Sequence, residues 1–257
     1  MLKTGKDIIK AHPLELFNRI LSSGKYPTLW SFGLIVPIHK KDDRSKAENY
    51  RGITLLCALG KLFTSILNDR LYHYMTKKGI LKAEQGGFKK RHSTVDSIFI
   101  LKTLIDKFFK SKPQKRRNLL FSCFIDFRKA FDRIPRQKLF EKLRKEGIKG
   151  RFLEMVMFMY SNDKSAVKIN NKMTEAFPYY TGVKQGCMLS PTLFNLYLSD
   201  LHEFLNSSSS TDILLDDSER PLNCLLHADE LVIFSRSANG LQTLLNKLES
   251  YCEKLKF

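Results

Sequence analysis

Two acidic residues interrupt an apolar stretch near the end of the sequence. The segment 225–235 reads LLHADELVIFS, so Asp229 and Glu230 have apolar residues on both sides. A buried carboxylate is costly unless a counter-charge or a metal ion neutralises it. Two interpretations follow: either a cation binds here, or the acids mark a tight turn that reaches water.

A third acid ends a separate apolar stretch. The segment 119–127 reads LLFSCFIDF and carries Asp126 next to its last residue. If the two stretches are neighbouring strands of one sheet, Asp126, Asp229 and Glu230 converge. Hard cations such as Mg²⁺ take oxygen ligands, and a pair of them activates a hydroxyl and stabilises a leaving pyrophosphate. Asp42–Asp43 lies among lysines and Asp216–Asp217 has a turn composition, so both are interpreted as solvated.

The composition indicates a polyanionic partner. The 257 residues are 43% hydrophobic, which is enough for a large core and one or two lobes. The net charge is +18, although a merely soluble basic protein would also have such a charge. No apolar run is long enough for a membrane span, and the first ten residues lack a secretion signal. We expect reduced cysteines and an intracellular protein, in the nucleus or cytoplasm. The histidine and cysteine spacings do not indicate a zinc site.

The elements that must position these acids alternate between helices and strands. Helical spacing is predicted over 13–23, with Pro13 near the start, over 59–77, and over 93–109 with Ser93 as N-cap. Segment 32–39 is predicted to be an edge strand because Pro37 interrupts it, and 40–51 a charged loop. The other predicted elements are helices over 135–147, 152–160, 192–205 and 241–256, and strands over 119–127, 166–169, 174–180 and within 222–235 with a turn at Ala228–Asp229.

Six segments in this order resemble the reverse transcriptase domain of non-LTR (LINE-type) retrotransposons. They are VPIHKK (36–41), NYRGITLL (49–56), EQGGFKKRHST (84–94), FIDFRKAFD (124–132), GVKQGCMLSP (182–191) and HADE (227–230). Each segment alone is a weak signal, but their order argues against coincidence. The resemblance covers nearly the whole chain.

The resemblance implies an α+β fold, the fingers and palm of a right-hand polymerase, with a catalytic hairpin in the palm sheet. It places a fingers-like part at about 1–118 and the palm at 119–257, with some interleaving of the two. It also leads us to expect a domain truncated at both ends, with the thumb absent and no endonuclease region.

The resemblance further implies RNA-directed DNA polymerase activity through two Mg²⁺ ions, with Mn²⁺ as an alternative metal. The catalytic metal ligands would be Asp126, Asp229 and Glu230, together with the backbone carbonyl of Phe127. The implied partners are an RNA template, a DNA primer and deoxynucleoside triphosphates, with no membrane.

Five other positions would bind the incoming nucleotide. Lys40 and Arg51 would contact its triphosphate, because phosphate oxygens favour a point charge or a fork of donors. Phe131 would lie under the sugar and exclude a 2′-hydroxyl, while Gln185 and Gly186 would contact the nucleotide. Phe131 as a core residue and Arg51 as a surface charge are the alternatives. Lys89–Arg91 is interpreted either as a grip on template phosphates or as a solvated turn.

The sequence departs from the family pattern at the hairpin. Glu230 stands where an Asp is expected, and its extra methylene moves the carboxylate outward. His227 replaces the expected aromatic residue. These departures keep a second hypothesis open, a catalytically decayed or repurposed fragment that only binds nucleic acid. A third, an RNA-directed RNA polymerase, is disfavoured by Phe131.

Overall fold

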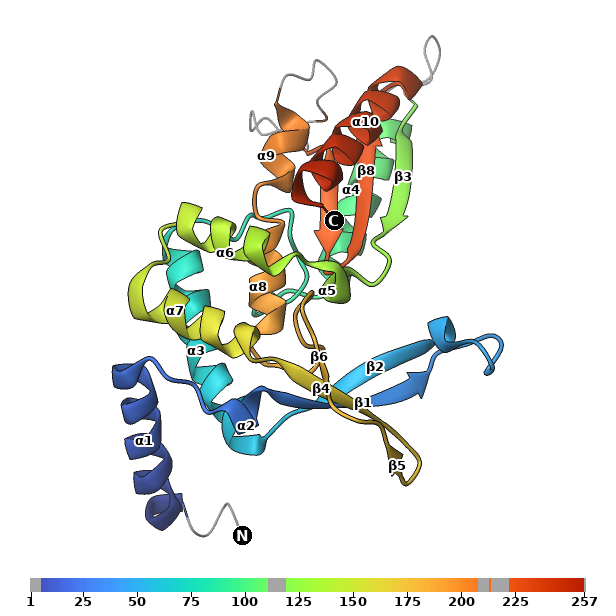
Figure 1. The fold of residues 1–257 in the computed structure, drawn as a ribbon. Helices are drawn as coiled ribbons and strands as arrows, with labels where there is room; N and C mark the ends of the chain where they lie inside the picture. Colours follow the sequence, from blue (N-terminus) through green and yellow to red (C-terminus); the bar gives the residue numbers. More distant parts are fainter. Residues whose placement is uncertain (1–5, 111–118, 208–212, 214–221, 257) are drawn as a thin grey trace. The chain divides into compact units, whose positions relative to one another are not determined.

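The computed structural model of the chain describes residues 6–110, 119–207, 213 and 222–256. Its contacts divide the chain into two compact units (Figure 1). The first unit comprises Met1–His73 and Arg136–Ser190, and the second comprises Tyr74–Pro135 and Pro191–Phe257. The proposed boundary between a fingers-like part and a palm near residue 118 stays a prediction. The Asp216–Asp217 pair lies outside the described residues.

The first unit is built on a sheet with strand order β2-β1-β4-β5, in which β6 also pairs with β4. Strands β1 and β4 are parallel, and the other pairs are antiparallel. Its elements are α1 (Lys6–Ser23), α2 (Thr28–Ser31), β1 (Phe32–His39), the 3₁₀ turn η1 (Ala47–Asn49), β2 (Tyr50–Leu55), the start of α3 (Ala58–Lys77), α6 (Arg136–Lys145), α7 (Gly150–Ser161), β4 (Lys164–Ile169), β5 (Lys172–Met173) and β6 (Phe177–Pro178).

An aromatic cluster joins the N-terminal helices of the first unit. Phe17 of α1, Trp30 of α2 and Phe63 of α3 are buried together with Tyr26. The Phe17 and Phe63 ring centroids are 5.3 Å apart, and the Tyr26 and Trp30 rings meet edge to face at 5.6 Å. Aromatic rings bury large apolar areas and favour such tilted contacts, so this cluster fixes the three helices against one another.

The second unit is built on the antiparallel sheet β3-β8-β7, which carries the predicted metal ligands. Helices α4 and α10 pack against this sheet (Figure 1). Its elements are α4 (Thr94–Lys110), β3 (Phe121–Asp126), α5 (Ala130–Arg133), most of α8 (Ser190–Tyr197), α9 (Leu201–Asn206), β7 (Cys224–His227), β8 (Glu230–Ser235) and α10 (Ala238–Leu255).

A buried apolar cluster attaches α4 to one face of that sheet. Leu104 of α4 is fully buried with Leu225 of β7 and with Val232 and Phe234 of β8. Because side chains alternate across a strand, Val232, Phe234 and Glu230 share one face of β8. The packing of α4 therefore determines which way the acid at the start of β8 points.

Several sequence predictions are confirmed and others are wrong. The two strands joined at Ala228–Asp229 are confirmed. Strand β1 is not an edge strand, because it lies between β2 and β4. Its pairing with β4 ends at Ile35, so Pro37, which has no N–H to donate, has only β2 beside it.

Three further element predictions need correction. Helix α1 begins at Lys6, so Pro13 lies inside it. The single helix predicted over 192–205 is two helices, α8 and α9, and the strand predicted over 174–180 is only the two-residue β6. The sequence pattern predicted a charged loop over 40–51 and no strand after it, so β2 was missed. Pairing with β1 over Tyr50–Leu55 overrides the local propensity of this segment.

Truncating Leu104 tests the packing of α4. We expect Leu104→Ala to lower the free energy of unfolding by roughly 2–5 kcal/mol, because it leaves a cavity in a fully buried cluster. Phe99→Ala on the same helix is the matched control, since Phe99 is 69% exposed. Urea unfolding followed by circular dichroism measures both. Equal losses for the two variants would contradict this packing.

Candidate active site

The end of β3 and the β7–β8 hairpin lie side by side, as the sequence predicted. Asp126, the last residue of β3, is directly opposite Glu230, the first residue of β8. The backbone N–H of Phe127 donates to the carbonyl of Asp229 at 3.0 Å. Residues about one hundred positions apart in the sequence are thereby held together by main-chain hydrogen bonds.

Of the two hairpin acids, Asp229 lies in a tight turn and Glu230 begins β8. His227 pairs with Glu230, which leaves Ala228 and Asp229 as the two turn residues. Ala228 has a φ of 57°, a left-handed conformation that costs a residue with a Cβ about 1–2 kcal/mol. Asp126 and Glu230 are exposed and Asp229 is half-buried. The interpretation as a turn that reaches water is therefore correct, and it leaves the acids accessible to a cation.

The chemistry of these acids suits a hard divalent cation. Within the described ranges, no hydrogen bond or ion pair engages the Asp126, Asp229 or Glu230 carboxylates. Neighbouring carboxylates without a counter-charge repel one another, and a cation would relieve that repulsion. However, no three His, Cys, Asp or Glu side chains of the described residues gather into one ligand group. Metal binding would therefore require these side chains to rotate toward one another.

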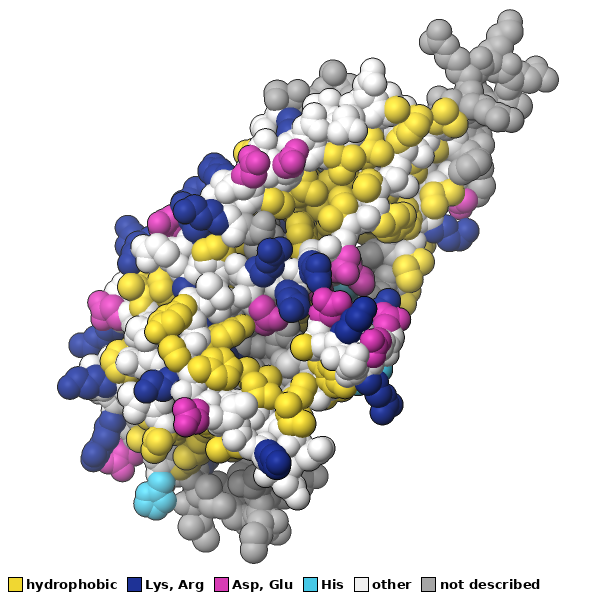
Figure 2. All heavy atoms as spheres, turned by 45° about the vertical axis from the view of Figure 1, so that its right-hand side comes forward, with side chains coloured by type: hydrophobic (Ala, Val, Ile, Leu, Met, Phe, Trp, Pro, Cys, Tyr) yellow, Lys and Arg dark blue, Asp and Glu magenta, His cyan; other side chains and the backbone are white. Residues whose placement is uncertain are grey.

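An open pocket of about 520 Å³ lies beside the carboxylates, between α4 and the sheet. Asp126, His227 and Glu230 line it together with apolar side chains. Phe124, two residues before Asp126 on the same strand, is 70% exposed. Figure 2 shows hydrophobic side chains gathered on the surface and Lys and Arg spread among Asp and Glu, so the visible face is not uniformly basic.

The segment 84–94, which resembles the template-side motif of the family, pairs with the outer edge of β7. The Leu226 N–H donates to the Glu84 carbonyl at 2.9 Å, and the Gly86 N–H donates to the Leu226 carbonyl at 2.8 Å. A Cβ built on Gly87 would lie 2.0 Å from the backbone nitrogen of Ala228, so this glycine is required for the close approach. The motif therefore supports the hairpin turn from outside, which sequence reasoning missed.

The basic residues of this motif have different environments. Lys89 is half-buried and its ammonium donates to the Lys82 carbonyl at 3.0 Å. Burial lowers the pKa of Lys89, and the nearby Glu84 opposes that effect. Lys90 and Arg91 are exposed. Lys89 thus bonds to the backbone of its own segment and is not fully solvated, and a grip of this segment on template phosphates stays a prediction.

Phe131 packs between two other aromatic rings. Its ring stacks on that of Phe194 with centroids 4.8 Å apart and planes 6° apart. Phe88 meets it edge to face at 5.7 Å. The ring is nevertheless only half-buried. Packing accounts for one side of Phe131, and its role beneath a sugar stays a prediction.

The other nucleotide-binding candidates belong to the first unit. Lys40 and Arg51 are exposed at the far end of the β1–β2 hairpin, where the Lys40 N–H donates to the Asn49 carbonyl. The Thr54 N–H donates to the Gln185 carbonyl at 2.8 Å. The strand that carries Arg51 is therefore bonded to the loop that carries Gln185.

Gly186 has a structural reason to be glycine. Its φ is 128°, and a Cβ built on it would lie 2.3 Å from the carbonyl oxygen of Thr54. The backbone of Gly186 therefore lies close to strand β2. Contact of Gln185 and Gly186 with a nucleotide stays a prediction.

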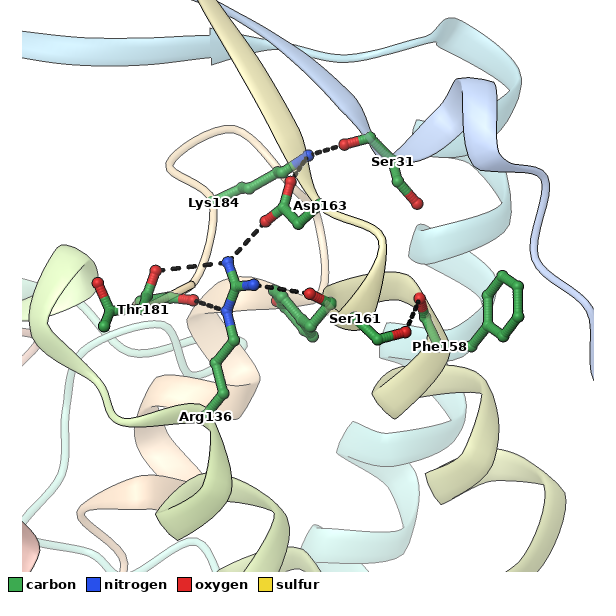
Figure 3. A network of polar contacts seen from close by, with 9 residues as sticks. Ser31, Arg136, Phe158, Ser161, Asp163, Thr181 and Lys184 are labelled. Atoms are coloured by element: carbon green, nitrogen blue, oxygen red, sulfur yellow. Dashed lines mark hydrogen bonds and ion pairs between the residues drawn. The ribbon is translucent and has the colours of Figure 1, made fainter. Parts of the chain in front are cut away.

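Sequence reasoning missed a buried charge cluster beneath this loop. Arg136, Asp163 and Lys184 are all buried, and both cations pair with the one carboxylate (Figure 3). The chain has 44 Lys and Arg residues, and nothing in the sequence distinguishes these two from the solvated ones.

Comparison with known proteins identifies the family. The model of the family described as reverse transcriptase (RNA-dependent DNA polymerase) matches residues 38–257, which is most of the chain. The chain therefore belongs to the reverse transcriptase family. The resemblance to non-LTR retrotransposon polymerases is also confirmed, because the similar curated proteins are of that kind.

Three Drosophila melanogaster proteins illustrate the similarity. The chain is 30% identical to the probable RNA-directed DNA polymerase from transposon BS, over 93% of this chain and 26% of that protein. It is 25% identical to the RNA-directed DNA polymerase from mobile element jockey, over 93% of this chain and 25% of that protein. It is 27% identical to the Pol polyprotein from the type-2 retrotransposable element R2DM, over 95% of this chain and 22% of that protein. The chain thus spans about a quarter of their lengths.

Solved structures support the mixed α and β fold. A telomerase from Candida tropicalis, truncated from its C-terminal domain, has a TM-score of 0.60 at 14% identity, over 86% of this chain and 46% of that one. The telomerase from Candida albicans, solved with a fragment of telomeric RNA, has a TM-score of 0.59 at 13% identity, over 91% and 43%. The fold of this chain is therefore similar to part of the telomerase fold.

Gly87→Ala tests the support of the hairpin turn by the template-side motif. We expect it to destabilise the second unit by roughly 1–3 kcal/mol, because the new Cβ would collide with the Ala228 backbone. Gly79→Ala is the control, since Gly79 has a positive φ but open space around it, and its loss should be about 1 kcal/mol. Thermal unfolding compares them. A loss at Gly87 no larger than at Gly79 would exclude the close contact.

Proposed function

We propose that this chain is the reverse transcriptase domain of a non-LTR retrotransposon and extends a DNA primer on an RNA template. The observation that carries the proposal is the register of β3 and β8, which sets Asp126 opposite Glu230 and joins Phe127 to Asp229. Family membership supports the reaction class. The net charge of +18 supports an RNA template and DNA primer as partners.

Asp126, Asp229 and Glu230 would hold two divalent cations, with the Phe127 carbonyl as a further ligand. Such ions, when bound, lower the pKa of the primer hydroxyl and stabilise the negative charge of the departing pyrophosphate. The exposed carboxylates of Asp126 and Glu230 let the cations enter from solvent. Magnesium suits this oxygen donor set, and manganese is the alternative.

The remaining candidates would orient the deoxynucleoside triphosphate. Lys40 and Arg51 are exposed cations on one hairpin and would contact its phosphates. The half-exposed Phe131 ring, held by Phe88 and Phe194, would exclude a 2′-hydroxyl. A ring that stacks on Phe194 and meets Phe88 edge to face has little freedom to move, and steric selection between sugars requires a rigid ring.

Asp126→Asn tests the catalytic assignment. We expect primer extension on an RNA template with Mg²⁺ to fall by about 10³-fold or more, because the amide removes a charge that the cations need. Glu249→Gln on α10 is the charge-matched control, since Glu249 is exposed. Radiolabelled primer extension measures all three proteins. A variant that extends as well as the parent would disprove the assignment.

Glu230→Asp tests the departure from the family pattern. The shorter side chain should bring its carboxylate to the distance that strict Mg²⁺ geometry favours. We expect a rise of up to about tenfold in the single-turnover rate, which corresponds to about 1.4 kcal/mol. Glu249→Asp serves as the control. An unchanged rate would mean that the hairpin already accommodates the glutamate.

A second candidate function is nucleic-acid binding without catalysis. It is favoured by the finding that, within the described part of the chain, the three carboxylates do not gather into one ligand group. In that case the parent extends no primer but binds RNA, and its affinity falls with salt because the release of counterions into a more concentrated solution is less favourable. The extension assay above separates the two functions.

A further inference from the structure

The loop that carries Gln185 and Gly186 rests on a buried ion cluster of the first unit. An Arg136 Nη2 lies 2.6 Å from Oδ2 of Asp163, and the Lys184 Nζ lies 2.5 Å from Oδ1 of the same carboxylate. The Asp163 side chain is fully buried, and the two cations are 8% exposed. One carboxylate thus bridges a helix residue, Arg136, and a loop residue, Lys184 (Figure 3).

Arg136 binds the start of this loop through its guanidinium. Nε donates to the Gly182 carbonyl at 3.0 Å, and Nη2 also reaches the Thr181 carbonyl at 3.4 Å. Nη1 donates to the Tyr160 carbonyl at 2.7 Å. The fork of donors on Arg is rigid and planar, so the Asp163 carboxylate that orients Arg136 also orients the loop backbone.

Lys184 binds the next part of the loop, directly before Gln185. Besides the Asp163 carboxylate, its ammonium donates to the carbonyl of Ser31 at the end of α2. Lys184 is buried, and a buried lysine almost always has a partner for its charge. Both of its contacts are needed to offset the desolvation of the ammonium.

The other side of the loop is held by β2. The Gln185 carbonyl accepts from the Thr54 N–H, and Gly186 packs directly against the Thr54 carbonyl. The loop is therefore fixed from both sides at Thr181, Gly182, Lys184 and Gln185. The half-buried Gln185 side chain projects from a backbone that has little freedom to move.

Asp163 is the one anion of this cluster and is in contact with both cations. Burial raises the pKa of its carboxyl, whereas Lys184 and Arg136 oppose that rise. Removing the negative charge would leave two buried cations facing each other. Their repulsion would be relieved most easily by an outward movement of the loop, since Arg136 begins a helix.

We propose that Asp163 is a positioning residue, which holds the loop 181–187 so that Gln185 and Gly186 receive the incoming nucleotide. This inference rests on the proposed function, because it assigns Gln185 and Gly186 to nucleotide binding. Asp163 reaches the nucleotide only through this loop. Its removal therefore affects nucleotide affinity more than the chemical step.

Hydrogen–deuterium exchange tests the structural half of the proposal without requiring activity. In Asp163→Asn, amides of 181–187 should exchange at least about tenfold faster than in the parent, while those of α3 stay unchanged. Glu141→Gln is the matched control, because Glu141 forms an exposed ion pair with Lys138 in the same unit. Unchanged exchange in the loop overturns the proposal.

Steady-state primer extension tests the functional half. We expect the KM for the deoxynucleotide to rise about tenfold or more in Asp163→Asn, with kcat changed by less than about threefold. A fall of about tenfold or more in kcat with an unchanged KM overturns the positioning role. If the parent extends no primer, the proposed function fails, and the exchange result still decides whether Asp163 holds the loop.

A paired substitution keeps the test valid if Asp163→Asn fails to fold. Asp163→Asn with Lys184→Met removes one cation together with the anion and keeps a side chain of similar length. We expect the double variant to fold, and its amides over 181–187 to exchange faster than those of the parent. Exchange in the double variant equal to that of the parent would show that the cluster does not position the loop and would overturn the proposal.

Discussion

The antiparallel register between β3 and β8 is the constraint on which the candidate site depends. A slip of one residue would turn Asp126 to the opposite face of the sheet. The register is specified by burial, because Val232 and Phe234 must face Leu104 of α4, and Glu230 shares their side of β8. Hydrophobic packing thus determines the direction of carboxylates that are themselves exposed. Helices cover both faces of this sheet, and the acids lie at its end, where the α4-facing side of β8 begins with Glu230.

The hairpin turn shows how that constraint is maintained at a strained position. Ala228 has a left-handed backbone, and such strain persists only where the surroundings determine the conformation. The main-chain bonds of Leu226 with Glu84 and Gly86, and the contact of Gly87 with the turn, supply these surroundings. A segment more than one hundred residues earlier therefore stabilises the turn that presents Asp229. Motifs that resemble separate functional signatures form one structural assembly in the second unit.

The first unit uses a different physical solution for a loop of comparable importance. The loop at Gln185 is held by buried charges and by bonds to β2, in addition to its buried apolar side chains Val183 and Cys187. Buried ion pairs add little net stability but penalise alternative arrangements strongly, because a displaced partner leaves a charge unpaired. Such a cluster favours one geometry over others. This property suits a loop that must present a side chain in one orientation.

Sequence alone determined the family, the two apolar stretches that carry the acids, and the hairpin turn at Ala228–Asp229. These features depend on local patterns and on the order of short motifs, which are visible along the chain. Tertiary structure alone decided that β1 is central despite Pro37, that Gly87 and Gly186 are needed for contact with Ala228 and Thr54, and that Asp163 pairs with Arg136 and Lys184. The physical reason is that burial and pairing depend on which distant segments come into contact. The residue types along the chain do not by themselves predict those contacts.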